Sequence, residues 1–390
     1  MSPIAQKTLF DLTQDGLVIG NKLKPLYPEF DVSAFVSDVR KEMQNQTIYN
    51  VTNAIGKVLR HHLPQNYPEA LSILMEYVKI ESPKTPSKNP TPELELSLRP
   101  ISHFLSLYGL EDITTSLNAF GELSKYRCTR GGQIREFIIQ HPDECFRQFG
   151  VWAKNENPNL RLFVAAALSM RGTWQKWLRP YISDPQPILN ILDQLYTDPD
   201  ERVREHVAKD MRDIIKEFPE IGYNTLKQWS HGSSSKETQK LLRQALKYQL
   251  KIGDERAYKL LDLEVPSKLG KPNIKPIALK CKQNPHPINE PFQFYFSYTN
   301  ESEDDQSILT YYIICYKRLT GHITRKRYRL SQRKLKPKQQ VDYEKSLFPL
   351  PSLKQYHDGK AGLGWHRLEL EINGEVIDGV DFHVVAPIKR

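Results

Sequence analysis

Two stretches of the chain gather positive side chains of the kind that bind phosphate groups. Residues 125–179 contain ten lysines and arginines against four acidic residues. Residues 317–338 contain ten basic residues and no acidic one, interleaved with Tyr328 and His322. Lysine and arginine neutralise the phosphates of a nucleic-acid backbone, so these stretches indicate a polyanionic partner. A solvated helix face, or edge-strand lysines that prevent aggregation, would also explain such runs.

The excess of positive charge lies almost entirely in the last third of the chain. The 390 residues carry a net charge of +9, and residues 268–390 hold 21 Lys and Arg against 13 Asp and Glu, a net of +8. Such asymmetry favours a polyanionic partner. Charge that merely keeps a protein in solution is an equally good explanation on composition alone.

Composition excludes several classes of protein. No run approaches the roughly 20 apolar residues of a membrane helix, and the N-terminus has no apolar secretory segment. The four cysteines are far apart, with no pair at C-x-x-C spacing, which argues against disulfides and zinc: Cys128, Cys145, Cys281 and Cys315. We therefore expect a cytoplasmic monomer with no metal ion, no other cofactor and no membrane contact.

Residues 1–265 have the pattern of successive amphipathic helices, interrupted by a Pro/Ser/Lys-rich loop at about 81–96. The motif LRLFVA, which contains Arg161, returns 43 residues later as VREHVA, which contains Arg204. That spacing is typical of HEAT-like units, in which paired helices stack into a solenoid. Residues 200–216 illustrate one such helix, because its apolar residues recur every three or four positions: Val203, Val207, Met211, Ile214 and Ile215.

After residue 265 the period changes from that of a helix to that of a strand. Residues 292–298, 309–316, 365–372 and 376–385 alternate between apolar and polar, and Asn373-Gly374 between the last two is a strong hairpin signal. Short strands over residues 272–390 predict an immunoglobulin-like β-sandwich. The expected fold is therefore a HEAT-like α-α superhelical solenoid followed by a β-sandwich, with the boundary at residues 264–272.

Short segments in a fixed order also match one known family. They are residues 28–31, 63–71, 108–110, 184–187 and 203–216 and, in the β-domain, Tyr312, Tyr316, Lys317, Gly321, His366 and Asn373-Gly374. On these segments the chain resembles the AlkC-type DNA alkylation repair proteins, which are HEAT-like-repeat DNA glycosylases related to AlkD. It looks like the subgroup with an immunoglobulin-like C-terminal domain.

The resemblance implies that double-stranded DNA is the partner. It also implies excision of cationic N-alkylated bases, such as N3-methyladenine and N3-methylcytosine, without flipping the base out of the duplex. A ring-alkylated base is a good leaving group, so the enzyme need only stabilise an oxocarbenium-like sugar and position water. A carboxylate beside the sugar can do both.

Asp213 is the candidate for that carboxylate, because it matches the aspartate of the family's corresponding helix. The competing interpretation is a surface ion pair with Lys209, four residues earlier. Two further family carboxylates fall at Gly131 and Ala166 here. Glu122 and Glu136 are candidates to replace them from nearby turns.

Trp174 is the candidate for lining the lesion site, although a tryptophan on a helical repeat more often belongs to the core. The candidate DNA contacts are basic residues of both domains, and Arg325, Lys326 and Arg327 are expected to project from a loop tip. The full set is Arg130, Arg135, Arg161, Arg171, Arg204, Lys209, Arg212, Arg325, Lys326 and Arg327.

Three functions compete on the sequence. The first is a glycosylase acting on alkylated bases. The second is a catalytically silent relative that binds damaged or distorted DNA, which the losses at Gly131 and Ala166 favour. The third is a scaffold whose helical solenoid binds other proteins.

Overall fold

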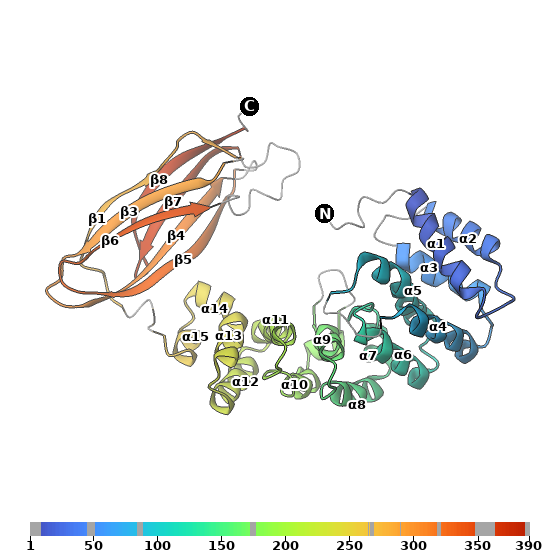
Figure 1. Ribbon diagram of the computed structural model, residues 1–390. Helices are drawn as coiled ribbons and strands as arrows, with labels where there is room; N and C mark the ends of the chain where they lie inside the picture. Colours follow the sequence, from blue (N-terminus) through green and yellow to red (C-terminus); the bar gives the residue numbers. More distant parts are fainter. Residues whose placement is uncertain are drawn as a thin grey trace. The chain divides into compact units, whose positions relative to one another are not determined.

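The computed structural model describes residues 9–44, 51–83, 89–171, 177–263, 265, 269–288, 290–317, 321–347 and 363–386. Contacts within the chain divide it into two compact units, Met1–Leu246 and Lys247–Arg390. The first unit is helical and the second carries the β-strands (Figure 1). The expected order of a helical solenoid followed by a β-domain is therefore confirmed.

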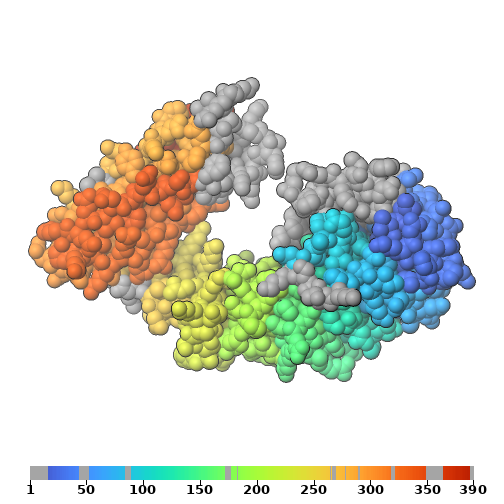
Figure 2. All heavy atoms as spheres, in the orientation of Figure 1, coloured from blue at the N-terminus to red at the C-terminus, as the bar shows by residue number. Residues whose placement is uncertain are grey.

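The first unit is a solenoid of helices that follow one another in the order of the sequence (Figures 1 and 2). Helices close in sequence pack together, as in the pairs α1–α2, α3–α5, α9–α11 and α11–α13. The helices are α1 (Leu9–Leu23), α2 (Val32–Gln44), α3 (Val51–His62), α4 (Tyr67–Glu81), α5 (Pro92–Tyr108), α6 (Ile113–Lys125), α7 (Arg135–Gln140), α8 (Pro142–Trp152), α9 (Pro158–Ala167), the 3-10 helix η3 (Arg179–Ile182), α10 (Gln186–Leu192), α11 (Glu201–Glu217), α12 (Pro219–Gly232) and α13 (Lys236–Ala245).

Helix α11 confirms the helix expected at residues 200–216. The side chain of Asp200 caps its first turn by accepting a hydrogen bond from the backbone N–H of Arg202. Phe218 ends the helix just before Pro219. The expected apolar stripe is buried, and it includes Val203, Val207, Met211, Ile214 and Ile215. This packing fixes which side chains of α11 are left to face outward.

The second unit begins with two short helices and continues as two packed sheets. The helices are α14 (Lys247–Ile252) and α15 (Glu255–Leu260), and the strands are β1 (Ile274–Cys281), β2 (His286–Pro287), β3 (Phe292–Asn300), β4 (Gln306–Lys317), β5 (Ile323–Leu335), β6 (Gln340–Leu347), β7 (Gly364–Ile372) and β8 (Glu375–Val385). One sheet has the order β1-β3-β6 and the other β2-β8-β7-β4-β5. Their inner faces meet in a core rich in aromatic residues.

The hairpin expected at Asn373-Gly374 is confirmed. Both residues have positive φ, 51° and 91°, as a type I′ turn requires. Ile372 pairs with Glu375 across the turn. The four expected strand segments lie in β3, β4, β7 and β8, whereas β1, β2, β5 and β6 were not anticipated from the sequence.

Helices α14 and α15 belong to the second unit because they cover part of its larger sheet. The hydroxyl of Tyr258 on α15 lies 3.1 Å from that of Tyr311 on β4. The guanidinium of Arg327 on β5 lies 3.6 Å above the Tyr311 ring and donates a hydrogen bond to the backbone carbonyl of Lys251. The compact unit thus starts at Lys247, upstream of the composition change at residues 264–272. In neither unit do the described residues include a helix both long and apolar enough to cross a membrane.

Candidate nucleic-acid interface

A cleft with a volume of about 910 Å³ opens within the helical unit. Its walls come from α3, α5, α6, α9 and α11 and from the loop between α6 and α7. Helix–helix packing thus brings together residues that are far apart in the sequence. The polar lining residues are Thr52, Glu95, Arg99, His103, Ser106, Ser124, Arg127, Thr129, Arg130, Gln133, Asn159, Ser169, His206 and Lys209.

The cleft is positively charged. Arg99, Arg127, Arg130 and Lys209 line it, and Glu95 is the one carboxylate among the described lining residues. Glu95 is neutralised, because it forms an ion pair with Arg99 and lies 3.9 Å from the guanidinium of Arg130. A cleft of this charge attracts a polyanion.

Several polar atoms in the cleft wall are buried without a hydrogen-bond partner among the described residues. They include Arg99 Nε, Thr129 Oγ1 and His206 Nδ1. Buried polar atoms in folded proteins are nearly always paired, with the protein, with water or with a ligand. Their concentration here indicates a surface built to receive polar groups.

Two histidines of the cleft are held in the neutral form. Burial lowers the pKa of His103 to about 4, helped by the nearby charge of Arg99. Burial also lowers the pKa of His206 to about 4, helped by Lys209 and Arg127. At neutral pH both imidazoles therefore keep a free lone pair within an otherwise cationic cleft.

Gly131 lies where the loop between α6 and α7 meets the end of α9. A Cβ atom at this position would lie 2.3 Å from the carbonyl oxygen of Ala166 and 2.5 Å from the backbone nitrogen of Ala167. Both of those contacts are with backbone, which cannot move aside cheaply. The two positions at which the resemblance led us to look for carboxylates thus pack against each other, and this backbone has no room for a side chain at Gly131.

Asp213 lies on α11, one helical turn after Lys209. Its side chain is half-buried and forms no hydrogen bond or ion pair with any described residue. The surface ion pair with Lys209 is therefore not formed. Burial raises the pKa of Asp213, while the nearby charges of Lys209, Arg212 and Arg171 act to lower it. An unpaired carboxylate among cations is available for a ligand.

Asp210, on the same helix, is a second unusual carboxylate. It is 1% exposed and forms no ion pair with a described residue, and Ser169 lies within hydrogen-bonding reach of its carboxyl group. Burial raises its pKa well above the usual value. The side chain points to the buried side of α11, toward Ser169 and Arg135.

Replacing Asp210 by asparagine should therefore stabilise the helical unit at neutral pH. Because the folded pKa is raised, Asp210 costs no stability below the pKa of the unfolded chain and costs progressively more as the pH rises above it. We expect a gain of about 1–3 kcal/mol in the free energy of unfolding at pH 7 and almost none at pH 3. Urea denaturation at both pH values measures it. Glu205→Gln, an exposed change on the same helix, is the control, and an equal gain at both pH values would contradict the prediction.

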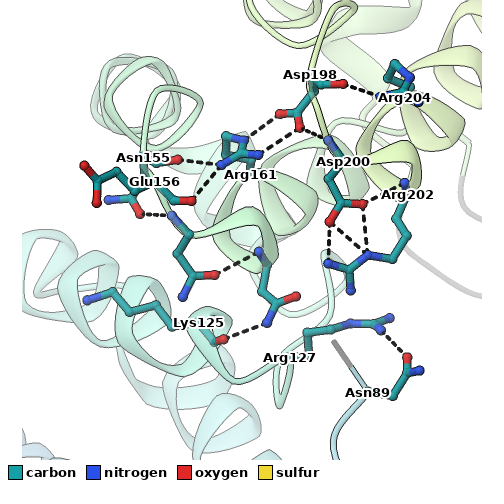
Figure 3. Close-up of polar contacts among 12 residues, drawn as sticks. Asn89, Lys125, Arg127, Asn155, Glu156, Arg161, Asp198, Asp200, Arg202 and Arg204 are labelled. Carbon is teal, nitrogen blue, oxygen red and sulfur yellow. Dashed lines mark hydrogen bonds and ion pairs between the residues drawn. The ribbon is translucent and has the colours of Figure 1, made fainter. Parts of the chain in front are cut away.

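Arg161 and Arg204, expected to contact DNA, instead hold together the turns between helices (Figure 3). Arg161 is buried and binds Asp198 through two hydrogen bonds of 2.5 and 2.8 Å. It also donates to the carbonyls of Asn155 and Glu156. Arg204 donates to the carbonyl of Asp198. Each arginine thus reaches back six residues to the turn before its helix, so the repeated motif has a structural role. The burial of Arg161 argues against its predicted DNA contact, whereas that of half-buried Arg204 stays a prediction.

Arg135 is also structural. It is 1% exposed and donates hydrogen bonds to the carbonyls of Ala167 and Met170. Its guanidinium therefore fixes the chain just after α9, and a direct DNA contact is excluded by its burial.

The two substitute carboxylates do not line the basic cleft. Glu122 lies in a separate cavity of about 540 Å³ and forms a 2.5 Å ion pair with Lys125. Glu136, on α7, accepts a hydrogen bond from Gln140. Asp213 itself is not among the described residues that line either cavity, so the structure does not bring the three carboxylates together in one cavity.

The remaining candidates of the helical unit have mixed positions. Arg130 and Lys209 line the cleft, as a DNA contact requires. Arg171 forms a 3.0 Å ion pair with Glu217 and stacks on Trp177. Arg212 is half-buried on α11, and Trp174 lies outside the described residues.

The basic segment of the β-domain is a strand and not a loop tip. Arg325, Lys326 and Arg327 lie in β5, paired residue by residue with β4. Arg325 forms a 2.6 Å ion pair with Glu369, and Arg327 pairs with Glu371. The expected projecting loop was wrong because the turn precedes these residues, at Gly321.

Sequence reasoning missed Arg99, His103, Arg127 and His206 as cleft residues. The first two lie on α5, far from α11 in the sequence, so only the packing reveals them. His206 could have been predicted from the sequence, because His206, Lys209 and Asp213 are spaced three and four residues apart and therefore share a helix face.

A helical solenoid with a basic cleft, followed along the chain by an immunoglobulin-like domain, defines the class to which this fold belongs: the chain has the fold of an AlkC-type protein. The structure is similar to that of Pseudomonas fluorescens alkylpurine DNA glycosylase AlkC bound to DNA containing an abasic site analog. The TM-score is 0.79 at 21% identity, over 96% of this chain and 98% of that one.

Sequence comparison agrees with this architecture. Residues 277–386 match the family described as "Uncharacterised protein YhaZ, C-terminal Ig-like domain". The chain is also 26% identical to the uncharacterized protein YhaZ of Bacillus subtilis (strain 168) over 360 residues, which are 92% of this chain and 93% of that protein.

Proposed function

We propose that this chain is a DNA-repair protein that binds alkylated double-stranded DNA through the basic cleft of its helical unit. The observation that carries the proposal is the cleft lined by Arg99, Arg127, Arg130 and Lys209, whose one described carboxylate is already paired. The similar AlkC structure, which holds DNA containing an abasic site analog, supports the choice of DNA as the polyanion.

The binding proposal predicts a specific salt dependence. Replacing Arg130 and Lys209 by glutamine should reduce the slope of log affinity against log salt by about 1–2, because each lost phosphate contact releases about one counterion fewer. Duplex binding at several salt concentrations measures the slope. Lys227→Gln, an exposed change on α12, is the control, and a slope that stays the same in the double variant would contradict the assigned cleft.

The proposed reaction is hydrolysis of the N-glycosidic bond of cationic N-alkylated bases, of the 3-methyladenine and 3-methylcytosine type, with the base left in the duplex. Asp213 would stabilise the positive charge that develops on the sugar as the base departs. In support, its carboxylate is half-buried and has no partner among the described residues.

Asp213→Asn should therefore slow release of alkylated bases from methylated duplex DNA by about a hundredfold, the usual effect of removing one electrostatic stabiliser of a transition state. Its affinity for unmodified duplex should change little. Single-turnover release of the free base measures the rate. Unchanged release in the variant would remove Asp213 from the mechanism.

A second function is favoured by the contact between Gly131 and Ala166. With no side chain possible at Gly131 and a methyl group at Ala166, the chain lacks two carboxylates of the family that it resembles. It would then be a catalytically silent relative that recognises damaged or distorted duplex. This alternative predicts tight, salt-dependent binding and no base release by the wild-type protein.

A further inference from the structure

His206 is placed for chemistry that the sequence did not suggest. It lies on α11, lines the basic cleft and is half-buried. Nδ1 is buried without a partner, whereas Nε2 is not among the buried unpaired atoms. Neither ring nitrogen forms a hydrogen bond with a described residue, so Nε2 is the ring nitrogen left open to a ligand in the cleft.

The surroundings of His206 keep its ring neutral. Burial, Lys209 on the same helix and Arg127 in the loop between α6 and α7 together lower its pKa to about 4. That value is close to the pKa of an ordinary aspartate. The neutral imidazole is therefore a base of about carboxylate strength, and it carries no negative charge to be neutralised by the cations around it.

Apart from the two histidines, the described residues that line the cleft offer no free base. Among the described lining residues, Glu95 is ion-paired with Arg99, and Gly131 and Ala166 offer no functional group. The other charged or titratable side chains that face the cleft are cations or a second neutral histidine: Arg99 and His103 on α5, Arg127 and Arg130 in the loop, and Lys209 on α11.

We propose that His206 is the catalytic base of this cleft and accepts a proton at Nε2 from the water that attacks the sugar. The inference rests on the proposed glycosylase function. As the C1′–N bond breaks, its electron pair leaves with the alkylated base, which becomes neutral. The water oxygen bonds to C1′, and its proton passes to His206 and then to solvent. His206 thus supplies the proton acceptor, while Asp213 stabilises charge.

The test compares His206 with an exposed histidine outside the cleft, in single-turnover release of methylated bases from duplex DNA. His206→Ala should slow release by about a hundredfold, as removal of a general base does, with duplex affinity within about twofold, and added imidazole should restore part of the rate. His231→Ala, which removes an exposed histidine of α12 that does not line the cleft, should release bases at the wild-type rate and should not respond to imidazole. His206→Gln, which keeps a polar side chain of similar size, should release bases as slowly as His206→Ala. This variant controls for a loss of activity caused by misfolding.

The outcomes separate this inference from the proposed function. If the wild-type protein binds alkylated duplex and releases no base, the glycosylase function and the role of His206 both fall. If the wild type is active and His206→Gln is equally active, only the role of His206 falls. A slow His206→Ala variant that imidazole does not restore would make the residue structural, which also overturns the inference.

Discussion

Arg161→Met should lower the free energy of unfolding of the helical unit by about 3–5 kcal/mol, because it leaves the partner of a buried ion pair without its counter-charge. The side chains of Arg161 and Asp198 are only 10% and 2% exposed. The substitution also removes the donor to the carbonyls of Asn155 and Glu156. Urea denaturation of the full chain, monitored by the helical signal, measures the change.

Two further variants make this prediction specific. Arg204→Met should cost less, about 1 kcal/mol, because Arg204 is only half-buried and donates to a backbone carbonyl. Replacing Arg161 by methionine and Asp198 by leucine together should recover much of the loss, since no charge is then left unpaired. If the Arg161→Met protein were as stable as the wild type but bound DNA more weakly, the phosphate contact that the sequence predicted for Arg161 would be supported instead.

Gly131→Ala should destabilise the helical unit by about 3 kcal/mol, the upper part of the usual range for overpacking. The new methyl group would overlap the backbone of Ala166 and Ala167, at 2.3–2.5 Å. Gly150→Ala is the matched control. The added Cβ there meets only the Ile191 side chain at 4.0 Å, so this helical glycine should gain about 0.5–1 kcal/mol.

The same contact makes a prediction about activity. Gly131→Glu, which installs the carboxylate of the family at its matching position, should not increase base release, because the side chain cannot be accommodated without moving α9. Thermal unfolding and single-turnover release on the same preparation separate the two effects. A Gly131→Glu protein that is as stable as the wild type and releases bases faster would show that this packing is not decisive.

The sequence predicted the elements whose information is local. The helix at residues 200–216 is set by its apolar period, its Asp200 cap and the Phe218-Pro219 stop, all within the segment itself. The hairpin at Asn373-Gly374 is set by two residues that tolerate positive φ. For such elements, the residues that determine the local structure are adjacent in the sequence.

The sequence could not separate cations that bind a ligand from cations that hold the fold. Arg130 and Arg161 look alike in sequence, yet Arg130 lines the cleft and Arg161 is buried on Asp198. Which group each arginine contacts depends on which turns lie next to each other in the solenoid. The motif that contains Arg161 and Arg204 was interpreted as a repeated binding surface. What repeats is a hydrogen bond from each arginine to a backbone carbonyl of the turn before its helix.

The β-domain shows the same limit in a different form. The alternation of β5 is masked by its many basic residues, two of which, Arg325 and Arg327, form ion pairs with Glu369 and Glu371 from β7. A cross-strand partner that lies more than forty residues away in the chain cannot be recognised from the strand alone.

The packing of α15 against the larger sheet has a practical consequence for dissecting this protein. A fragment cut where the composition changes, at residue 272, would strip Tyr258 from Tyr311 and the Lys251 carbonyl from Arg327. It would expose an aromatic surface of the sheet to water and invite self-association. A fragment that starts at Lys247 keeps that surface covered, and is the unit in which the immunoglobulin-like domain should be expressed alone.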